Sequence, residues 1–358
     1  MNADAQSRSR ALDGLRGIAV LQVVIFHYYL LLPIETDGYL LLRRLGGVID
    51  GLTLFFVLSG FLIGGILLDA RAAPGMFRVF YWRRACRILP LYFLLLATYG
   101  AVRLMDKQGH FGLIYYWYGE FPFWNYLVFW QNERMVRDAV LGAPWLVVTW
   151  SLAVEMQFYL IAPWVLRFVS DRRLLVGLGA GCVLAAPLLR SGTNPYLLTG
   201  RLDALVAGVL LAIMLRNTSG QSFLLRNRKA LRVLVGVYLV TLVLLRAVNA
   251  TSPILDNLTT TALVYAVLIA LLADGSPWPV VRPVIEVLAP FGLLSYFIYL
   301  FHLPVAYVFA AFRPQLSVLA LPVTVGLAAL SYRHFERPLI GWGHRLQYRQ
   351  PERFPSHS

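Results

Sequence analysis

Apolar runs long enough to cross a lipid bilayer recur along the whole chain, and this feature most restricts what the chain can fold into. A membrane-spanning helix needs roughly 20 predominantly apolar residues. The 358 residues contain about ten such runs. They cover 12–33, 48–68, 85–105, 145–167, 173–190, 198–216, 231–248, 257–274, 286–310 and 315–335. Because backbone groups in lipid must be satisfied within the protein, the pattern predicts an all-α polytopic membrane protein, a bundle of about ten transmembrane helices.

Composition supports a single membrane domain. Hydrophobic residues make up 59% of the chain and charged residues only 14%, whereas a soluble domain carries about 25% charged residues. The two cysteines, Cys86 and Cys182, lie in or beside apolar runs, so neither a disulfide framework nor a metal site is expected. We predict one transmembrane domain over 1–345 and a short, disordered cytoplasmic tail over 346–358.

The distribution of positive charge predicts the orientation. The formal net charge is +14, which in a soluble protein would suggest a nucleic-acid partner. With the N-terminus in the cytoplasm and ten alternating spans, about two-thirds of the Lys and Arg residues fall on the cytoplasmic side. We therefore expect an integral protein of the cytoplasmic (inner) membrane with both termini in the cytoplasm, no cleavable signal, lipids as neighbours and no nucleic-acid partner.

The first span, DGLRGIAVLQVVIFHYYL, carries ionisable residues that are costly in hydrocarbon. Arg16 and His27 are eleven residues apart, almost three helical turns, so they share one face about 16 Å apart along the axis. Such a stripe suits an elongated ligand that enters from the cytoplasm. Taken alone, the pair also fits an arginine that reaches the headgroups and a structural histidine between helices. Asp13, three residues before Arg16, is placed to orient it.

Other ionisable residues occur in later spans. Glu155 lies near the middle of the fourth span and His302 well inside the ninth. Histidine titrates near neutrality and can act as a general base, so Glu155 or His302 could orient a catalytic His27. Further polar positions are Arg201 and Asp203 near the start of the sixth span, for which mutual pairing is an equal alternative, and Glu336 where the tenth span leaves the membrane.

A basic cluster, YWRRACRILPLYF, enters the third span from the cytoplasmic side. Arg84 and Arg87 share a helix face, and guanidinium groups bind phosphates in a bidentate manner. Together with Arg83, they predict a phosphate-binding rim, although an anchor on lipid phosphates is the simpler reading of the cluster alone. Ser59 in the second span does not lie in a G-x-S-x-G elbow and is not expected to be a nucleophile.

These motifs, in this order, resemble the acyltransferase-3 family of membrane proteins. The resemblance rests on RALDGLRGIAVLQVVIFH, DGLTLFFVLSGFLI, RRACRILPLYF, WSLAVEMQFYL, GRLDALVAG, SYFIYLFHLPV and FERP, which extend from about residue 10 to about 340. The resemblance implies a membrane O-acyltransferase that moves an acyl group, most often acetyl, from cytoplasmic acyl-CoA to a sugar hydroxyl of an exported glycan. No permanently bound cofactor is implied, because acyl-CoA is a donor substrate.

The resemblance also assigns roles to residues. The family's arginine and histidine eleven positions apart fall on Arg16 and His27, its arginine pair on Arg84 and Arg87, and its glutamates on Glu155 and Glu336. Together with the residues themselves, the resemblance predicts catalytic roles for His27 and Glu155 and acyl-CoA binding by Arg16, Arg83, Arg84 and Arg87. Supporting positions are Asp13, Arg201, Asp203, His302 and Glu336. Met156 stands where many members have a second carboxylate after Glu155.

Alternatives stay open at the level of sequence. Membrane-embedded Glu and His residues with a basic rim also suit a proton-coupled transporter or glycan exporter. Transfer by direct attack and transfer through an acyl-histidine intermediate fit the same residues. The aromatic connection 106–144 fits either a re-entrant element or an interfacial anchor.

Overall fold

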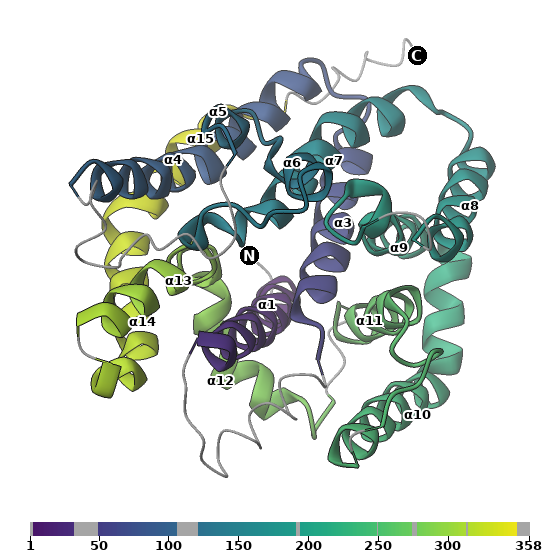
Figure 1. Ribbon diagram of the computed structural model, residues 1–358. Helices are drawn as coiled ribbons and strands as arrows, with labels where there is room; N and C mark the ends of the chain where they lie inside the picture. Colours follow the sequence, from purple (N-terminus) through teal and green to yellow (C-terminus); the bar gives the residue numbers. More distant parts are fainter. Residues whose placement is uncertain are drawn as a thin grey trace.

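The computed structural model describes residues 3–31, 49–105, 121–190, 194–248, 250–273, 278–312 and 314–348. Within these ranges the chain is helical and contains no β-strand. The longer helices are α1 (Ala3–Leu31), α3 (Gly51–Asp69), α4 (Met76–Met105), α7 (Thr149–Phe168), α8 (Arg172–Arg190), α9 (Leu198–Met214), α10 (Thr218–Ala247), α11 (Leu258–Ala273), α12 (Arg282–Leu293), α13 (Ser295–Phe312), α14 (Ala320–Ser331) and α15 (Arg337–His344). Figure 1 shows α1 surrounded by the other helices, with α10 and α14 at the periphery.

The helices have the length and composition of a polytopic membrane protein. Among the described residues, five helical segments are long and apolar enough to span a bilayer: Arg10–Tyr28, Gly51–Asp69, Met76–Met105, Thr218–Ala247 and Ser295–Phe312. Leu258–Ala273 is a shorter apolar helix. The first eight predicted spans each coincide with one helix, from α1 to α11. Residues 32–33, 48 and 274 at the ends of these spans lie outside the described residues.

Three helices extend well beyond the apolar runs that predicted them, and α1, which begins at Ala3 rather than near residue 12, is the first. Helix α4 begins at Met76 rather than near residue 85, and α10 begins at Thr218 rather than near residue 231. The added turns are rich in arginine, so they do not contribute to an apolar run although they are helical. In α4 this extension carries Arg83 and Arg84 on the same rigid helix as Arg87.

The ninth predicted span is wrong as a single helix. It is divided at Leu294 into α12 and α13. Pro290 lacks a backbone N–H and favours a break in this region. Gly292 follows it, and a Cβ atom there would lie only 1.7 Å from the carbonyl oxygen of Asp13. The break therefore lets α12 pack closely along α1 while α13 follows its own path.

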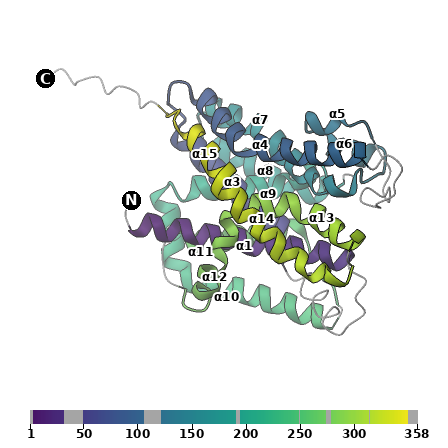
Figure 2. The same cartoon turned by 90° about the vertical axis from the view of Figure 1, so that its left-hand side faces the viewer.

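The tenth predicted span, 315–335, is also composite. A 3₁₀ segment (Pro314–Leu319) precedes α14, and a π-helical turn (Tyr332–Glu336) connects α14 to α15. Pro338, which has no N–H, follows this turn within α15 and disfavours a regular ladder of hydrogen bonds there. Figure 2 shows α14 and α15 following one another along one diagonal, so the π turn preserves the general direction of the chain.

Glycine contacts hold the central helices together. A Cβ atom at Gly17 of α1 would lie 2.1 Å from the carbonyl oxygen of Leu288 in α12. A Cβ atom at Gly60 of α3 would lie 1.9 Å from that of Leu205 in α9. Small residues permit this close approach of helix backbones in membranes. Both contacts lie next to polar side chains, Arg16 and Ser59, whose positions they fix.

The described part of the connection 106–144 packs into the bundle. Residues 106–120 lie outside the described residues, and 121–144 contain α5 (Trp124–Leu127) and α6 (Gln131–Arg137). Gln131 is fully buried, and its amide donates to the carbonyl of Thr149 at the start of α7 over 2.9 Å. This part of the connection is therefore fastened to α7.

Candidate functional site

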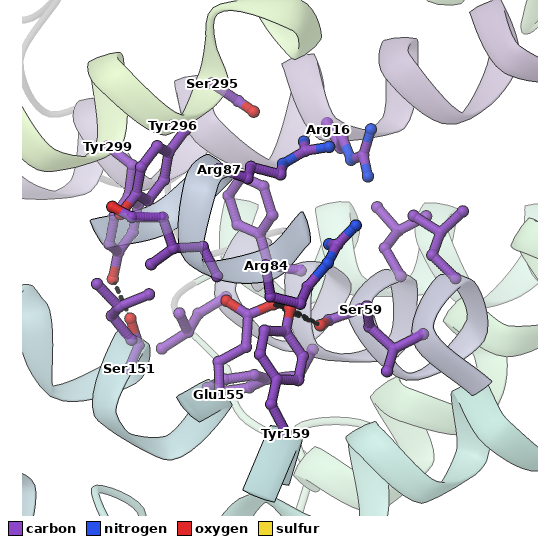
Figure 3. A pocket seen from close by; sticks show the side chains of 18 residues that line it. Arg16, Ser59, Arg84, Arg87, Ser151, Glu155, Tyr159, Ser295, Tyr296 and Tyr299 are labelled. Atoms are coloured by element: carbon purple, nitrogen blue, oxygen red, sulfur yellow. Dashed lines mark hydrogen bonds between the residues drawn. The ribbon is translucent and has the colours of Figure 1, made fainter. Parts of the chain in front are cut away.

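A cavity where α1, α3, α4, α7 and α13 meet contains three of the predicted arginines, and we call it the arginine cavity (Figure 3). Helix α1 contributes Arg16, and α4 contributes Arg84 and Arg87 from one face. Its polar lining consists of Arg16, Ser59, Arg84, Arg87, Ser151, Glu155, Tyr159, Ser295, Tyr296 and Tyr299. Residues from the sequence motifs of five helices thus line one cavity.

The arginine cavity carries an excess of positive charge. Arg16 is paired with Asp13, whose Oδ1 lies 3.1 Å from the Arg16 Nη1. Among the described residues, Arg84 and Arg87 form no ion pair with a carboxylate. Glu155 accepts hydrogen bonds from the Ser59 and Tyr159 hydroxyls at the base of the cavity. The excess of positive over negative charge in the cavity favours an anionic ligand such as a phosphate.

His27 lines a second cavity, which we call the histidine cavity. Its volume is about 530 Å³, within the range of roughly 300–1,000 Å³ typical of small-molecule sites. The polar and aromatic lining consists of Gln22, Phe26, His27, Asp50, Trp150, Tyr196, Arg201, Tyr299 and Tyr307. Arg16 and His27 of the same helix therefore line different cavities.

The two predicted histidines are direct neighbours. His302 Nδ1 lies 2.7 Å from the carbonyl oxygen of Tyr299, and its Nε2 lies 3.2 Å from His27 Nδ1. His27 Nδ1 also lies 2.9 Å from the carbonyl oxygen of Val23. Because a carbonyl only accepts, neutral His302 carries its proton on Nδ1 and leaves Nε2 as an acceptor. The single proton on His27 Nδ1 is then shared between the Val23 carbonyl and His302 Nε2, so the lone pair of neutral His27 lies on Nε2.

Leu52 and Tyr299 connect the two cavities, since both side chains line each of them. The Tyr299 hydroxyl donates to the carbonyl of Val148 over 2.9 Å and lies 2.5 Å from the Ser151 hydroxyl. The ring of Tyr299 is thus fastened to the start of α7. A slender ligand that extends from the arginines toward His27 passes these two residues.

Glu155 lies on the arginine side rather than beside His27. It lines the arginine cavity, whereas His27 lines the histidine cavity. Of the two residues that the sequence offered as partners of His27, the structure brings His302 into contact with it and places Glu155 with Ser59 and Tyr159.

Arg201 and Asp203 have separate partners. Arg201 lines the histidine cavity, donates to the Thr53 hydroxyl over 3.1 Å and lies 3.7 Å from an Asp50 carboxylate oxygen. Asp203 instead pairs with Arg190 at 2.6 Å. Their mutual pairing, which the sequence left open, is replaced by these contacts.

The last two predicted positions lie away from both histidines. Glu336 is buried in the π turn and accepts from the Ser331 hydroxyl over 3.1 Å. Arg83 lines a third cavity together with Arg84, described below.

The site also contains residues that the sequence did not single out. Tyr159 and Tyr299 bind other site residues through their hydroxyls, and Ser59, which was set aside as a nucleophile, binds Glu155. Tyrosines are common in the spans, so residue type alone does not distinguish these positions. Helical spacing was the available signal, since Tyr159 follows Glu155 by four residues and Tyr299 precedes His302 by three.

Comparison with known proteins identifies the family. A family model described as an acyltransferase domain, acyltransferase 3, matches residues 9–333. Peptidoglycan O-acetyltransferase OatA of Listeria monocytogenes is 27% identical over 359 residues, covering 92% of this chain and 55% of its own. A putative O-acetyltransferase of Staphylococcus aureus, SACOL0978, is 26% identical over 382 residues, covering 96% of this chain and 59% of its own.

A partial match points in the same direction. The putative peptidoglycan O-acetyltransferase YrhL of Bacillus subtilis is 32% identical over 165 residues, 42% of this chain and 23% of its own. The chain spans between 55 and 59% of the length of the two relatives that cover nearly all of it. No solved structure matches. The match over residues 9–333, together with the helical architecture, shows that this polytopic membrane protein belongs to the acyltransferase-3 family.

Proposed function

We propose that the protein transfers an acyl group, acetyl in the first instance, from acyl-CoA to a sugar hydroxyl, with His27 as general base. The observation that carries this proposal is the series of two cavities, one rich in arginine and one containing His27, that meet at Leu52 and Tyr299. A thioester on a long, thin arm can extend from one to the other while its phosphates stay with the arginines.

The charge of the arginine cavity supports acyl-CoA as the donor. Coenzyme A carries its phosphates at one end and its thiol at the other. Arg84 and Arg87, which have no carboxylate partner among the described residues, can bind phosphate oxygens. Since basic residues concentrate on one side of the predicted topology, we assign the arginine cavity, and with it both termini, to the cytoplasmic side.

The histidine pair supplies the chemistry. The acceptor hydroxyl gives its proton to His27 Nε2, and its oxygen attacks the thioester carbonyl carbon. The C–S bond then breaks, an ester forms, and the departing thiolate receives the proton from the imidazolium. His302 Nε2, as acceptor of the His27 Nδ1–H, orients the ring and stabilises the imidazolium. General-base catalysis of this kind contributes about 10²–10⁴-fold.

Two routes lead to the same product. In the first, the acceptor oxygen attacks the thioester directly. In the second, His27 Nε2 attacks the thioester first, and the C–S bond breaks to give an acyl-imidazole and the CoA thiolate. The acceptor oxygen then attacks the acyl carbon, the N–acyl bond breaks, and the hydroxyl proton goes to the thiolate. The routes differ in whether labelled acetyl-CoA leaves an acyl group on His27 when acceptor is absent.

The lining of the histidine cavity supports a sugar acceptor. Trp150 and Tyr196 contact one another edge to face, with ring centroids 4.7 Å apart. Phe26 and Tyr307 add further aromatic surface, and Gln22, Asp50 and Arg201 add hydrogen-bonding groups. Aromatic faces with polar groups around them suit a polyhydroxylated ring. Because relatives are named as peptidoglycan O-acetyltransferases, we propose a cell-surface glycan as the acceptor class.

Transfer by membranes that contain the protein tests the proposal. With radiolabelled acetyl-CoA and a glycan acceptor, we expect label in the glycan and one free thiol released per transfer. His27→Ala should lower the rate of acetyl transfer by about 10²–10⁴-fold because the base is lost. The expression level of the variant and its elution profile in size-exclusion chromatography after extraction in detergent should stay unchanged.

His334→Ala is the matched control, because His334 is an exposed histidine in the π turn. It should retain the wild-type rate. If His27→Ala transfers acetyl groups at a near wild-type rate, the catalytic assignment is wrong. If the wild type releases no thiol in the presence of acceptor, the donor assignment is wrong.

A further inference from the structure

A third cavity, which we call the α4–α15 cavity, continues the arginine cavity. Its volume is about 360 Å³, and it lies between the end of α3, the first turns of α4 and the end of α15. Arg84 lines both this cavity and the arginine cavity. A ligand bound by Arg84 in the arginine cavity therefore has room to extend into the α4–α15 cavity.

The charge in this cavity is positive. Arg83 and Arg84 form no ion pair with a carboxylate among the described residues. Asp69 also lines the cavity, but Arg216 binds both of its carboxylate oxygens, over 2.7 and 2.6 Å. The pKa of His344 is lowered, first by burial and second by repulsion from Arg83, Arg84 and Arg87. This repulsion reflects the same positive potential. An anionic group is thus favoured beside these arginines.

The far wall of the cavity is aromatic. The guanidinium carbon of Arg83 lies 4.9 Å from the centre of the half-buried Tyr348 ring, and Arg83 Nε donates to the carbonyl of Leu346 over 3.0 Å. Arg83 thereby fastens residues 346–348 to the cavity, in a part of the chain for which the sequence predicted a disordered tail. Residues 349–358 of that tail lie outside the described residues.

Close packing fixes this wall relative to the arginines. A Cβ atom at Gly343 of α15 would lie 2.9 Å from the Cβ atom of Cys86 in α4. Cys86 lies between Arg84 and Arg87 in the sequence, so the contact holds α15 directly over the arginine cluster. A flat ring and a pair of guanidinium groups are therefore presented together, and they match a phosphorylated purine nucleoside better than a phosphate alone.

We propose that the α4–α15 cavity binds the phosphorylated adenosine end of acyl-CoA, with Arg83 and Arg84 on its phosphates and the Tyr348 ring against the purine. This inference rests on the proposed function and adds the location of the nucleotide. The pantetheine arm then leads from Arg84 through the arginine cavity toward Tyr299 and His27. A lipid headgroup shares the phosphate chemistry but has no purine for the Tyr348 ring.

Full and truncated donors test the location. Arg83→Gln and Tyr348→Leu should each raise the KM for acetyl-CoA by about tenfold, the effect of one charge-assisted hydrogen bond or one base stack. Neither variant should change kcat or the KM for acetyl-pantetheine, which lacks the nucleotide. Arg78→Gln is the matched control, since Arg78 is an exposed arginine of the same helix that does not line the cavity.

A binding measurement makes the test independent of turnover. Adenosine 3′,5′-bisphosphate should bind the purified protein in detergent and compete with acetyl-CoA. Tyr348→Phe should bind this probe as the wild type does, whereas Tyr348→Leu should bind it about tenfold more weakly.

Three outcomes would overturn the inference. The first is an equal rise in KM for both donors, which would show a structural effect on the whole site. The second is unchanged binding of adenosine 3′,5′-bisphosphate in both Arg83→Gln and Tyr348→Leu. The third is that acetyl transfer by Arg83→Gln no longer depends on anionic phospholipid while adenosine 3′,5′-bisphosphate still binds normally. Arg83 would then bind a lipid headgroup. His27→Ala should bind the probe normally, so failure of the catalytic proposal and failure of this inference give different results.

Discussion

At the scale of single residues, the contact between His27 and His302 explains how a neutral imidazole can be held inside the bundle. The carbonyls of Val23 and Tyr299 fix the proton of each ring on Nδ1. His302 is fully buried, and its Nε2 accepts from His27. No carboxylate is needed to select the tautomer, because two backbone carbonyls and a second imidazole do so.

Removal of His302 should therefore affect turnover rather than binding. We expect His302→Ala to lower kcat by roughly tenfold or more, within the range of general-base effects, with an unchanged KM for acetyl-CoA. His302→Gln places an amide oxygen within reach of the His27 Nδ1–H and should recover part of the rate. Steady-state kinetics of both variants provide the measurement.

Tyr28→Phe is the control for disturbed packing, because the Tyr28 hydroxyl donates to the His302 carbonyl over 3.3 Å without touching the ring nitrogens. This variant should keep a near wild-type kcat. A His302→Ala variant with normal kcat and a raised KM would contradict a role in positioning His27.

At the scale of helices, backbone contacts at glycines determine where the polar side chains lie. Gly17 places α1 against α12, and Gly60 places α3 against α9. Arg16 and Ser59 are the immediate neighbours of these glycines, so each reaches the arginine cavity from a helix whose position is fixed next to it. The break at Leu294 serves the same contact, since it frees α12 to follow α1.

Substitution at such a contact should destabilise the bundle. A methyl group at Gly17 meets the Leu288 carbonyl oxygen at 2.1 Å. Gly17→Ala should therefore lower the free energy of unfolding by at least about 1–3 kcal/mol, the usual effect of overpacking. Thermal unfolding of the detergent-solubilised protein measures this change.

Gly236→Ala in α10 provides the comparison, because a Cβ atom there has no neighbour within 4 Å. Replacement of a helix glycine that has open space at its Cβ position by alanine should leave the protein as stable or slightly more stable. Equal melting temperatures for the two variants would show that the α1–α12 contact is less restrictive than its geometry indicates.

At the scale of the whole molecule, three cavities follow one another through the bundle. Arg84 is shared by the α4–α15 and arginine cavities, and Leu52 and Tyr299 are shared by the arginine and histidine cavities. In the proposed binding mode, the nucleotide, the pantetheine arm and the thioester of acyl-CoA occupy these cavities in that order. Under the proposed function, donor and acceptor then approach His27 from opposite sides of the membrane.

A bulky side chain at the junction should separate donor binding from transfer. We expect Leu52→Trp to abolish acetyl transfer because the thioester no longer reaches His27, while adenosine 3′,5′-bisphosphate still binds. Leu52→Met keeps the volume nearly constant and should remain active. Transfer by Leu52→Trp at the wild-type rate would show that the donor reaches His27 by another route.

The sequence alone determined the class of protein, the helices that match the first eight predicted spans and several of the residues that line the cavities. Each membrane-spanning segment must be apolar because polar groups exposed to lipid raise the free energy of the protein. This requirement applies to each segment separately, so an apolar run in the sequence is enough to predict a span. The motifs also point to Arg16, His27, Arg84, Arg87 and Glu155, because an ionisable side chain within an apolar run is conspicuous in the sequence itself.

Only the tertiary structure decided which of these residues meet. His27 contacts His302, which is 275 residues away, whereas Arg16, on the same helix as His27, lines the other cavity. The break at Leu294 and the π turn before Arg337 interrupt runs that are continuous in hydropathy. Such features depend on contacts between distant segments, such as the close approach of two backbones at a glycine or the packing of two rings. These contacts produce no periodic pattern in the sequence from which they could be predicted.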